Sequence, residues 1–330
     1  MNWSDLTVLI TGGTGSFGQK FTEIVLRECA PRKLIVFSRD ELKQHEMRQR
    51  WDDRPDDSRI RYFVGDIRDR DRLYRAMKGV DIVVHAAALK QVPACEYNPF
   101  EAVQTNVHGA QNIIDAAIDT GVKRVVALST DKAVNPVNLY GGTKLVAERL
   151  FIQGNAYAGK GGTRFACVRY GNVAGSRGSV IPLFLAQRQS GCVTVTDERM
   201  TRFWITLDQG VRFVLRAIEQ MSGGEVFVPK IPSMRVMDLV RAMAPDCKVS
   251  VTGIRPGEKL HESLLSDHEA AHTLEFDDMF VVQPEFPWWT RGRWEGGRPL
   301  VDGFRYTSDA NTEWLSVGEL CRMADEAVAV

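Results

Sequence analysis

Two neighbouring motifs combine residues that could exchange protons with a bound molecule. The first, "STDKA", places an acid and a base side by side, Asp131 and Lys132, directly after the apolar run "RVVAL". The second, "YGGTK", places Tyr140 and Lys144 four residues apart, so both project from one face of a helix. A tyrosine acts as a base near neutrality only if its pKa falls by about 3, and a nearby ammonium favours that fall. The motifs predict general acid–base chemistry where a strand ends and a helix begins.

The adjacent acid and base impose two conditions on each other. Neighbouring strand residues point to opposite faces, so Asp131 and Lys132 reach one ligand only if the strand has ended by Thr130. An ionised Asp131 would keep Lys132 protonated, so we expect the working pair to be a neutral acid and a neutral amine, which burial favours. The alternative is a salt-bridged turn at the surface.

A glycine-rich loop, "TGGTGSFG", follows the first apolar run directly. Gly12 suits a tight turn, Gly15 lets a pyrophosphate approach the backbone, and Gly18 permits close helix packing. The start of the following helix then faces the phosphates. The motif favours a bound dinucleotide over a glycine-rich turn without a ligand. The predicted contacts in this loop are Gly12, Thr14, Gly15, Ser16, Phe17 and Gly18.

The end of the second predicted strand indicates which dinucleotide binds. An NAD site usually offers a carboxylate there, whereas this strand ends in Ser38 and Arg39, with Lys43 one turn further on. These residues favour the 2′-phosphate of NADP, although Asp40 keeps NAD as an alternative. The predicted cofactor contacts outside the glycine loop are Ser38, Arg39, Lys43, Asp66, Ile67, Ala86, Lys90, Asn106, Tyr140 and Lys144.

The elements that must position these residues alternate between short β-branched runs and longer amphipathic stretches. This rhythm predicts an α/β fold of the Rossmann type, a doubly wound parallel sheet with a smaller interleaved C-terminal substrate-binding domain. Strands are expected at residues 6–10, 33–37, 60–64, 80–84, 124–128 and 163–169, and helices at 98–120 and 207–221. We expect residues 1–172 and 206–229 to bind the dinucleotide, and residues 173–205 and 230–330 to bind the substrate.

The composition excludes several classes of protein. The 330-residue chain carries 42 Lys and Arg against 42 Asp and Glu, so no basic excess indicates nucleic-acid binding. The longest apolar run, "VDIVVHAAAL", is too short to span a bilayer, and the N-terminus does not resemble an export signal. Six scattered cysteines without a C-x-x-C pair suit a reducing compartment. We therefore expect a cytoplasmic protein.

The three motifs together resemble the extended short-chain dehydrogenase/reductase family, which acts on nucleotide-sugars. Further segments, "HAAALKQVP", "RYGNVAGSRGSVIP" and "GIRPGEKLHE", resemble the inverting UDP-N-acetylglucosamine 4,6-dehydratases of pseudaminic acid biosynthesis. The resemblance covers nearly the whole chain but is poor at about residues 283–300, an aromatic stretch that suits either a structured loop or a subunit contact. It also implies a homo-oligomer.

This resemblance implies a reaction and a role for each motif residue. NADP takes a hydride from sugar carbon 4 and returns it to carbon 6, while water is lost and carbon 5 is inverted. Tyr140 would accept the proton of the carbon 4 hydroxyl, with its pKa lowered by Lys144, and Thr130 would orient the sugar. Lys132 would take the carbon 5 proton, and Asp131 would protonate the leaving hydroxyl.

The resemblance also implies which residues hold UDP-N-acetylglucosamine. The free amides of a helix that starts near Val180 suit the diphosphate, and the planar fork of Arg255 suits a phosphate. For Arg202, the alternative is an arginine that covers neighbouring aromatic rings. The predicted substrate contacts are Lys90, Thr130, Asn172, Val180, Arg202, Arg255 and Glu258.

Other activities fit the motifs less well. A retaining dehydratase of this fold would carry Asp-Glu in place of Asp131-Lys132, and a 4-epimerase would lack the pair. A non-catalytic NADP-binding regulator would not need Tyr140 and Lys144. The segment "HEAAH", residues 268–272, formally matches a zinc-protease motif, but no further histidine follows it, so we expect no metal site.

Overall fold

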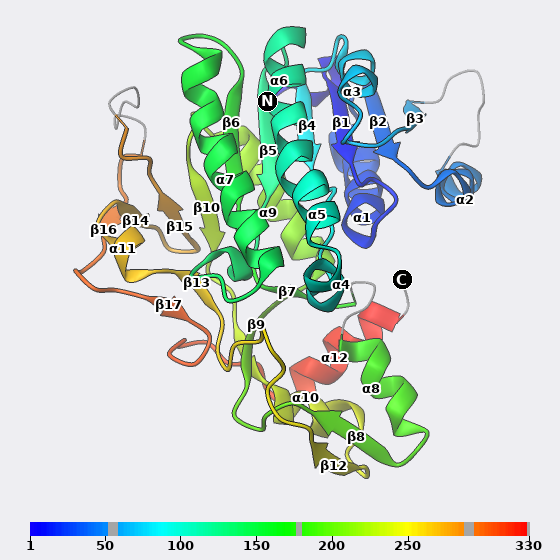
Figure 1. Ribbon diagram of the computed structural model, residues 1–330, viewed down its shortest axis with the longest axis vertical. Helices are drawn as coiled ribbons and strands as arrows, with labels where there is room; N and C mark the ends of the chain where they lie inside the picture. The colour runs from blue at the N-terminus through cyan, green and yellow to red at the C-terminus, as the bar shows by residue number, and fades with distance from the viewer. Residues whose placement is uncertain (52–58, 176–179, 287–293, 329–330) are drawn as a thin grey trace.

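A ten-stranded sheet forms the centre of the computed structural model, which describes residues 1–51, 59–175, 180–286 and 294–328 (Figure 1). Its order is β16-β14-β15-β10-β6-β5-β4-β1-β2-β3, and the strands from β10 to β3 are parallel. The connections change direction between β1 and β4, which is where such sheets bind ligands. The parallel strands are β1 (Thr7–Thr11), β2 (Lys33–Ser38), β3 (Ile60–Val64), β4 (Ile82–His85), β5 (Arg124–Leu128), β6 (Arg164–Val168) and β10 (Val226–Pro229).

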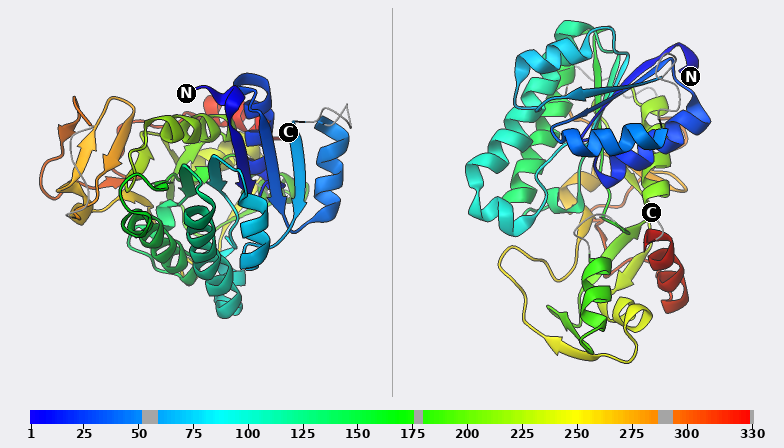
Figure 2. Two further views of the ribbon diagram at one scale, coloured as in Figure 1. Left: turned by 90° about the horizontal axis from the view of Figure 1, so that it is seen from above. Right: turned by 90° about the vertical axis from the view of Figure 1, so that its right-hand side faces the viewer.

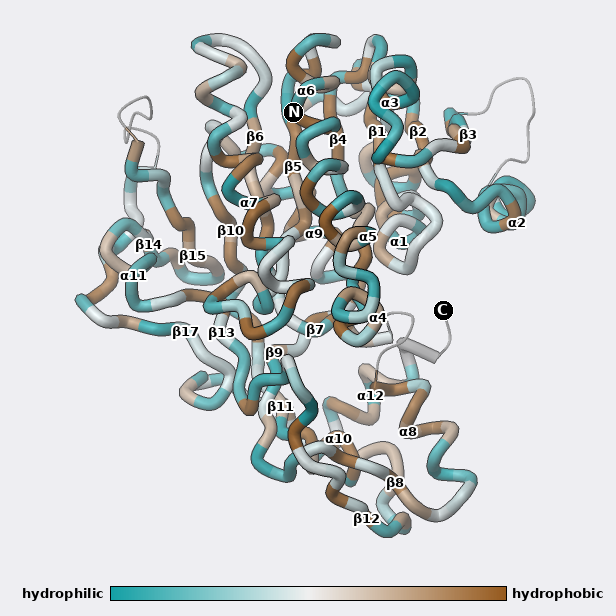
Figure 3. The backbone as a smooth tube through the Cα atoms, in the orientation of Figure 1, coloured by the Kyte–Doolittle hydropathy of each residue, from teal (hydrophilic) through white to brown (hydrophobic). Residues whose placement is uncertain are grey.

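Helices cover both faces of the sheet (Figure 2). One layer contains α3, α6 and α7, which pack side by side, while α1 packs against α9 on the other face. The central strands are mostly apolar, whereas the outlying α2 is mostly hydrophilic (Figure 3). The predicted doubly wound fold is confirmed. These helices are α1 (Ser16–Ile24), α2 (Glu41–Trp51), α3 (Arg70–Met77), α6 (Gly109–Thr120), α7 (Leu139–Ala158) and α9 (Leu207–Gln220).

The helix predicted over residues 98–120 contains an irregular turn. It consists of α5 (Pro99–Val103), a π-helical turn (Gln104–His108) and α6. Such turns interrupt helices frequently at functional sites. Here the turn carries Asn106, whose buried side chain bonds the loop after β4. A short preceding helix, α4 (Val92–Tyr97), follows the same loop.

A second, smaller core lies below the main sheet in Figure 1. Its buried side chains include Ile181, Phe184, Trp204 and Leu239. In contrast, Leu264, Phe280 and Tyr306 pack into the main core, so part of the region predicted to bind substrate extends the main sheet. The elements of the smaller core are β7 (Asn172–Val173), α8 (Val180–Arg188), β8 (Cys192–Val195), β9 (Thr201–Ile205), β11 (Ser233–Arg235), α10 (Val236–Met243), β12 (Lys248–Val251) and α12 (Val317–Val328). The later elements beside the main sheet are β13 (Ser263–Leu265), α11 (Asp267–Ala270), β14 (Thr273–Glu275), β15 (Met279–Val282), β16 (Arg298–Pro299) and β17 (Tyr306–Thr307).

A buried arginine joins the main sheet to the C-terminal segment. Arg169 follows β6, and its guanidinium lies 2.5 Å from Glu148 of α7 and 2.9 Å from Glu269 of α11. It also donates to the carbonyl of Leu264 at 2.9 Å. Glu269 in turn caps α11 by accepting from the amide and hydroxyl of Ser266. The glutamate of the "HEAAH" segment therefore belongs to an ion-pair cluster.

No helix among residues 1–51, 59–175, 180–286 and 294–328 is long and apolar enough to cross a membrane.

The aromatic stretch at about residues 283–300 is described only in part, because its centre, residues 287–293, lies outside the described residues. Next to it, Trp294 packs edge-on against Phe227 and Phe276, so this end of the stretch covers the main core.

Replacing Arg169 with methionine should strongly destabilise the fold, because it leaves two buried carboxylates without their cation. We expect the free energy of unfolding to fall by about 3 to 5 kcal/mol, measured by denaturant titration. The matched control is Arg212→Met, since Arg212 also bridges two carboxylates but its side chain is 48% exposed. Equal losses in the two variants would contradict a special role for the buried cluster.

Candidate active site

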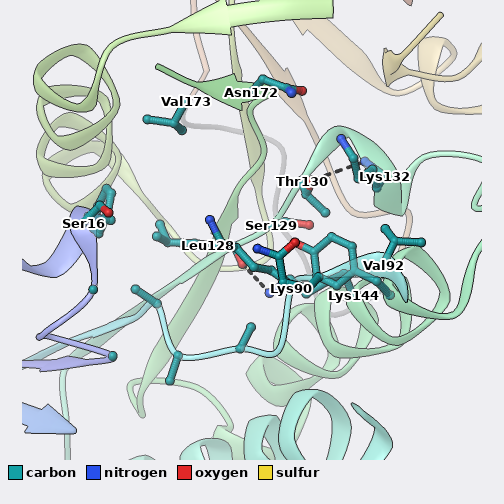
Figure 4. Close-up of a pocket in the computed structure, with 18 of the residues that line it drawn as sticks. Ser16, Lys90, Val92, Leu128, Ser129, Thr130, Lys132, Lys144, Asn172 and Val173 are labelled. Atoms are coloured by element: carbon teal, nitrogen blue, oxygen red, sulfur yellow. Dashed lines mark hydrogen bonds between the residues drawn. The ribbon is translucent and has the colours of Figure 1, made fainter. Parts of the chain in front are cut away.

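One cavity of about 860 Å³ lies at the carboxyl ends of the parallel strands and reaches the smaller core. It is lined by every residue that the sequence predicted to contact cofactor or substrate, with the exception of Asn106. Tyr170, Lys259 and Glu262 also line it and were not predicted. The two sets of predicted contacts therefore meet in a single cavity, and Figure 4 draws some of the residues that line it.

Asn106, also predicted to contact the cofactor, is not among the described residues that line the cavity, and that contact stays a prediction. The Asn106 amide accepts from the backbone amide of Leu89 at 2.8 Å and donates to its carbonyl at 2.9 Å. It also donates to the hydroxyl of Thr143 at 3.0 Å. Asn106 thus holds the loop after β4 against α7.

The glycine loop forms a cradle that side chains would fill. Gly12 has a φ of 66°, and a Cβ there would lie 2.9 Å from the backbone of Ala87. A Cβ on Gly18 would lie 2.3 Å from the carbonyl oxygen of Gly13. Gly15 is the N-cap of α1, so the free amides of the helix face the cavity. The cradle fits the pyrophosphate of a dinucleotide.

The adenosine end of the cavity carries paired charges. Ser38 ends β2, and its buried hydroxyl lies 2.7 Å from that of Thr14. The half-exposed Arg39 guanidinium lies 3.5 Å from Asp66, and Lys43 forms an ion pair with Asp40. Two cations thus stand at the end of β2, as predicted.

The acid–base pair lies in a turn and not in a strand. β5 ends at Leu128, and residues 131–133 form a 3₁₀ turn capped by the hydroxyl of Thr130, which accepts from the amide of Lys132. Both side chains therefore reach the same space, as the sequence required. The Lys132 ammonium lies 3.0 Å from Oδ1 of Asp131.

The helix that follows is placed against this turn by two local features. Asn138 caps α7, accepting from the amide of Gly141 at 2.7 Å. A Cβ on Gly141 would lie 2.1 Å from the carbonyl oxygen of Lys132. The first glycine of "YGGTK" therefore lets α7 contact the turn, which brings Tyr140 beside Lys132.

A third ionisable residue completes the pair. Oε1 of Glu262 lies 3.3 Å from the Lys132 ammonium and 3.8 Å from Nε of Arg202. Burial raises the pKa of Asp131 above its ordinary value, and the neighbouring charge of Lys132 opposes that rise. Burial lowers the pKa of Lys132, but the carboxylates of Asp131 and Glu262 outweigh it and the pKa is raised. The expected neutral amine is therefore not the resting form, because two carboxylates face it.

Tyr140 and Lys144 lie on the same wall of the cavity. Burial raises the pKa of Tyr140 to about 12, opposed by the charge of Lys132 and a hydrogen bond with Thr130. The Lys144 amine donates to the carbonyl of Leu128 at 2.6 Å (Figure 4), and burial lowers its pKa. The lowering of the Tyr140 pKa by Lys144 stays a prediction.

Arg202 and Arg255 were both predicted to contact the nucleotide, but their guanidinium groups differ in how many hydrogen bonds they already make within the protein. Arg202 donates through Nη1 to the carbonyls of Thr201 and Leu260, and through Nη2 to that of Lys259. Its geometry thus favours a role in bracing the cavity wall. Arg255, in contrast, is largely exposed and lies 3.6 Å from Glu258.

Two further predicted contacts also face the cavity. Oδ1 of Asn172 is buried without a hydrogen-bond partner, so it can accept from a ligand. Val180 begins α8 at the cavity wall, while residues 176–179 before it lie outside the described chain. The structure therefore leaves an acceptor and a helix start available to the substrate.

The doubly wound sheet, the glycine cradle and the Tyr140 helix define a dinucleotide-binding protein of the short-chain dehydrogenase/reductase fold. The chain belongs to the polysaccharide biosynthesis protein family, whose model matches residues 8–284. It is 50% identical over 322 residues to the UDP-N-acetylglucosamine 4,6-dehydratase (inverting) of Campylobacter jejuni, covering 95% of both chains. It is 43% identical over 286 residues to the UDP-glucose 4-epimerase of Rickettsia conorii, covering 84% of this chain and 83% of that one.

Solved structures show the same fold. Pen from Bacillus thuringiensis superposes with a TM-score of 0.91 and 39% identity, covering 100% of both chains. DesIV, a dTDP-glucose 4,6-dehydratase from Streptomyces venezuelae, superposes with a TM-score of 0.66 and 23% identity, covering 77% of this chain and 87% of that one. The DesIV structure contains NAD.

Replacing Gly12 with alanine should abolish dinucleotide binding, because the new Cβ would collide with the backbone of Ala87. We expect the affinity to fall by at least about 100-fold in a fluorescence titration, since the colliding backbone must move. Gly121→Ala is the matched control: Gly121 also has a positive φ, 74°, but a Cβ there meets nothing within 4 Å. It should lose stability but not affinity, and a similar loss of affinity in both variants would argue against the cradle.

Proposed function

We propose that the protein is an inverting UDP-N-acetylglucosamine 4,6-dehydratase, a lyase that uses a nicotinamide dinucleotide without consuming it. The observation that carries this proposal is the contact between Asp131 and Lys132 beside Tyr140, in the cavity that also holds the dinucleotide cradle. A plain dehydrogenase needs one fewer acid and one fewer base. The 50% identity to a relative with this name supports the same reaction.

Each step up to the loss of water has a residue in reach, and carbon 5 then takes up a solvent-derived proton on its opposite face as the hydride returns to carbon 6. A dinucleotide held by the glycine cradle would supply the acceptor for the hydride of sugar carbon 4 and the donor of that hydride to carbon 6. Tyr140 accepts the proton of the carbon 4 hydroxyl, while Thr130 orients the sugar and Lys144 faces the nicotinamide ribose. The resulting ketone acidifies carbon 5, whose proton passes to Lys132. Asp131 protonates the carbon 6 hydroxyl, which leaves as water.

A 4-epimerase is the second candidate. The specific observation in its favour is the 43% identity to a relative named UDP-glucose 4-epimerase. An epimerase would need Tyr140 but would leave Asp131 and Lys132 without a chemical step. A retaining dehydratase, the other alternative of this fold, would differ in the configuration at carbon 5. The three reactions therefore differ in their products.

We further infer that the cofactor is NADP. Arg39 and Lys43 stand where the 2′-phosphate of the adenosine ribose would lie, and β2 ends in Ser38 without a carboxylate of its own. The guanidinium of Arg39 is half exposed and makes one long contact, 3.5 Å to Asp66. It is therefore available to a phosphate at little cost.

Arg39→Ala should weaken NADP binding by about 10- to 100-fold, because it removes a charged hydrogen bond to the phosphate. Binding of NAD, which lacks that phosphate, should change by less than about 3-fold. Titration of both dinucleotides into both proteins measures this ratio. Equal losses for the two ligands would place the phosphate contact on Ser38 or Lys43 instead.

The surroundings of the enzyme can also be inferred. All six cysteines are free thiols, which suits the reducing cytoplasm. Tyr97 of α4 and Phe100 of α5 are more than four-fifths exposed, at 88% and 82%, which supports a homo-oligomer that covers them. The product would be a UDP-4-keto-6-deoxy-L-arabino-hexosamine, a precursor of the pseudaminic acid that the resemblance implies.

Proton NMR of the protein with NADP and UDP-N-acetylglucosamine in heavy water tests the activity. We expect a 4-keto-6-deoxy sugar with inverted configuration and deuterium at carbon 5. Lys132→Ala should lower the rate by about 10²- to 10⁴-fold, as for the loss of a general base, while the dinucleotide stays bound.

The other outcomes of this experiment separate the alternatives. A product with retained carbon 5 would identify a retaining dehydratase, and an epimerised sugar would identify a 4-epimerase. An unchanged substrate would favour a non-catalytic NADP-binding regulator.

A further inference from the structure

Glu262 is held in the cavity by the C-terminal segment, independently of the turn that carries the acid–base pair. Its backbone amide donates to the hydroxyl of Ser308 at 2.9 Å, and its carbonyl accepts from the amide of Ser308 at 2.8 Å. The side chain is 3% exposed and points to the Lys132 ammonium, 3.3 Å away. A carboxylate is thus brought to the pair from a distant part of the chain.

The two carboxylates around Lys132 are incompletely paired. Oδ2 of Asp131 and Oε2 of Glu262 are buried and have no hydrogen-bond partner. Buried charged oxygens without partners destabilise a fold, so this arrangement is costly unless it serves the ligand. Two other cations approach Glu262: Arg202 at 3.8 Å from β9, and Lys259, whose amine donates to the carbonyl of Val134.

The proton count of the reaction shows when Glu262 is needed. Before carbon 5 is attacked, Asp131 carries a proton and Lys132 is a free amine, so the pair holds one proton. The amine then takes the carbon 5 proton, and the electrons of that C–H bond pass into the enolate of the carbon 4 ketone. At this stage the pair holds two protons and one positive charge.

The elimination returns the pair to one proton. The enolate electrons form the double bond between carbons 5 and 6, the bond from carbon 6 to oxygen breaks, and the proton of Asp131 passes to the leaving oxygen to give water. The pair ends as a carboxylate and an ammonium, the arrangement in which Asp131 and Lys132 lie 3.0 Å apart. A proton shift along this one hydrogen bond restores the starting form.

We propose, on the basis of the function proposed above, that Glu262 is a positioning residue that holds Lys132 and supplies the counter-charge while the pair carries two protons. Asp131 cannot supply this charge, because it must stay neutral until it protonates the leaving hydroxyl. Glu262 is the other carboxylate within 4 Å of the Lys132 ammonium in the described chain. Arg202, 3.8 Å from the same Oε1, also favours the ionised form of Glu262.

The test compares Glu262→Gln with the wild-type holoenzyme in two steps of the same reaction. The variant keeps the shape of the side chain but removes its charge. We expect deuterium exchange at carbon 5 to slow by about 10- to 100-fold, because a charged hydrogen bond to Lys132 is lost. The absorbance rise at 340 nm on mixing with UDP-N-acetylglucosamine, which reports oxidation at carbon 4, should change by less than about 3-fold.

The pH profile of the exchange distinguishes a charge effect from a structural one. Glu262 is negative, so it raises the proton affinity of both Asp131 and Lys132, and its removal lowers both. Both limbs of the bell-shaped profile should therefore move to lower pH, by at least about 1 pH unit. Glu262→Asp keeps the charge and should restore the position of the limbs, even if it restores only part of the rate.

The control variant is Glu275→Gln, whose parent residue pairs with Lys230 outside the cavity; its rates and pH limbs should match the wild type. Unmoved limbs in Glu262→Gln, or equal slowing of both steps, would overturn the role of Glu262 while leaving the dehydratase intact. A wild-type protein that oxidises carbon 4 but returns an epimerised sugar without exchange at carbon 5 would overturn the dehydratase itself, and this role with it.

Discussion

The buried ion pairs of Arg169 connect the parts of the molecule on which the active site depends. Arg169 extends from the end of β6 to Glu148 and Glu269. Glu148 also accepts a hydrogen bond, at 2.6 Å, from Ser129, the first residue of the acid–base motif. Glu269 belongs to the segment just after Glu262. The cluster thus connects the turn that carries Asp131 and Lys132 to the β13–β17 strand pair, which begins directly after Glu262. Separating a buried guanidinium from its carboxylates is costly, so this connection is stable.

The two ends of the cavity need different charged groups, because one binds the dinucleotide and the other transfers protons. At the dinucleotide end, the cradle of Gly12, Gly15 and Gly18 needs backbone amides and open space, so a positive helix end and small residues suffice. At the sugar end, protons must move while buried charge stays compensated, so an acid and a base stand beside a further carboxylate. Tyr140 lies between the two ends of the cavity. It is beside Lys132 of the turn, and its own helix, α7, also carries Lys144.

Residues whose function depends on local backbone geometry could be predicted from the sequence. The glycine spacing, the end of the strand before Thr130 and the Tyr140–Lys144 repeat are all short-range patterns, and residues of each of them line the cavity. Asn106 has no comparable local pattern: it lies in a π-helical turn, and its amide bonds both backbone groups of Leu89. The role of Arg202 likewise depends on residues far away in the sequence, because its guanidinium donates to the carbonyls of Leu260 and Lys259.

The fold class, the dinucleotide cradle and the acid–base pair follow from short-range patterns, because strand alternation, helical repeats and glycine turns are set by neighbouring residues. Folding alone brings Glu262 to Lys132, joins three segments at Arg169 and adds residues of the C-terminal region to the main sheet. These contacts join residues that are far apart along the chain. Their charges matter only once burial removes the water that would otherwise screen them.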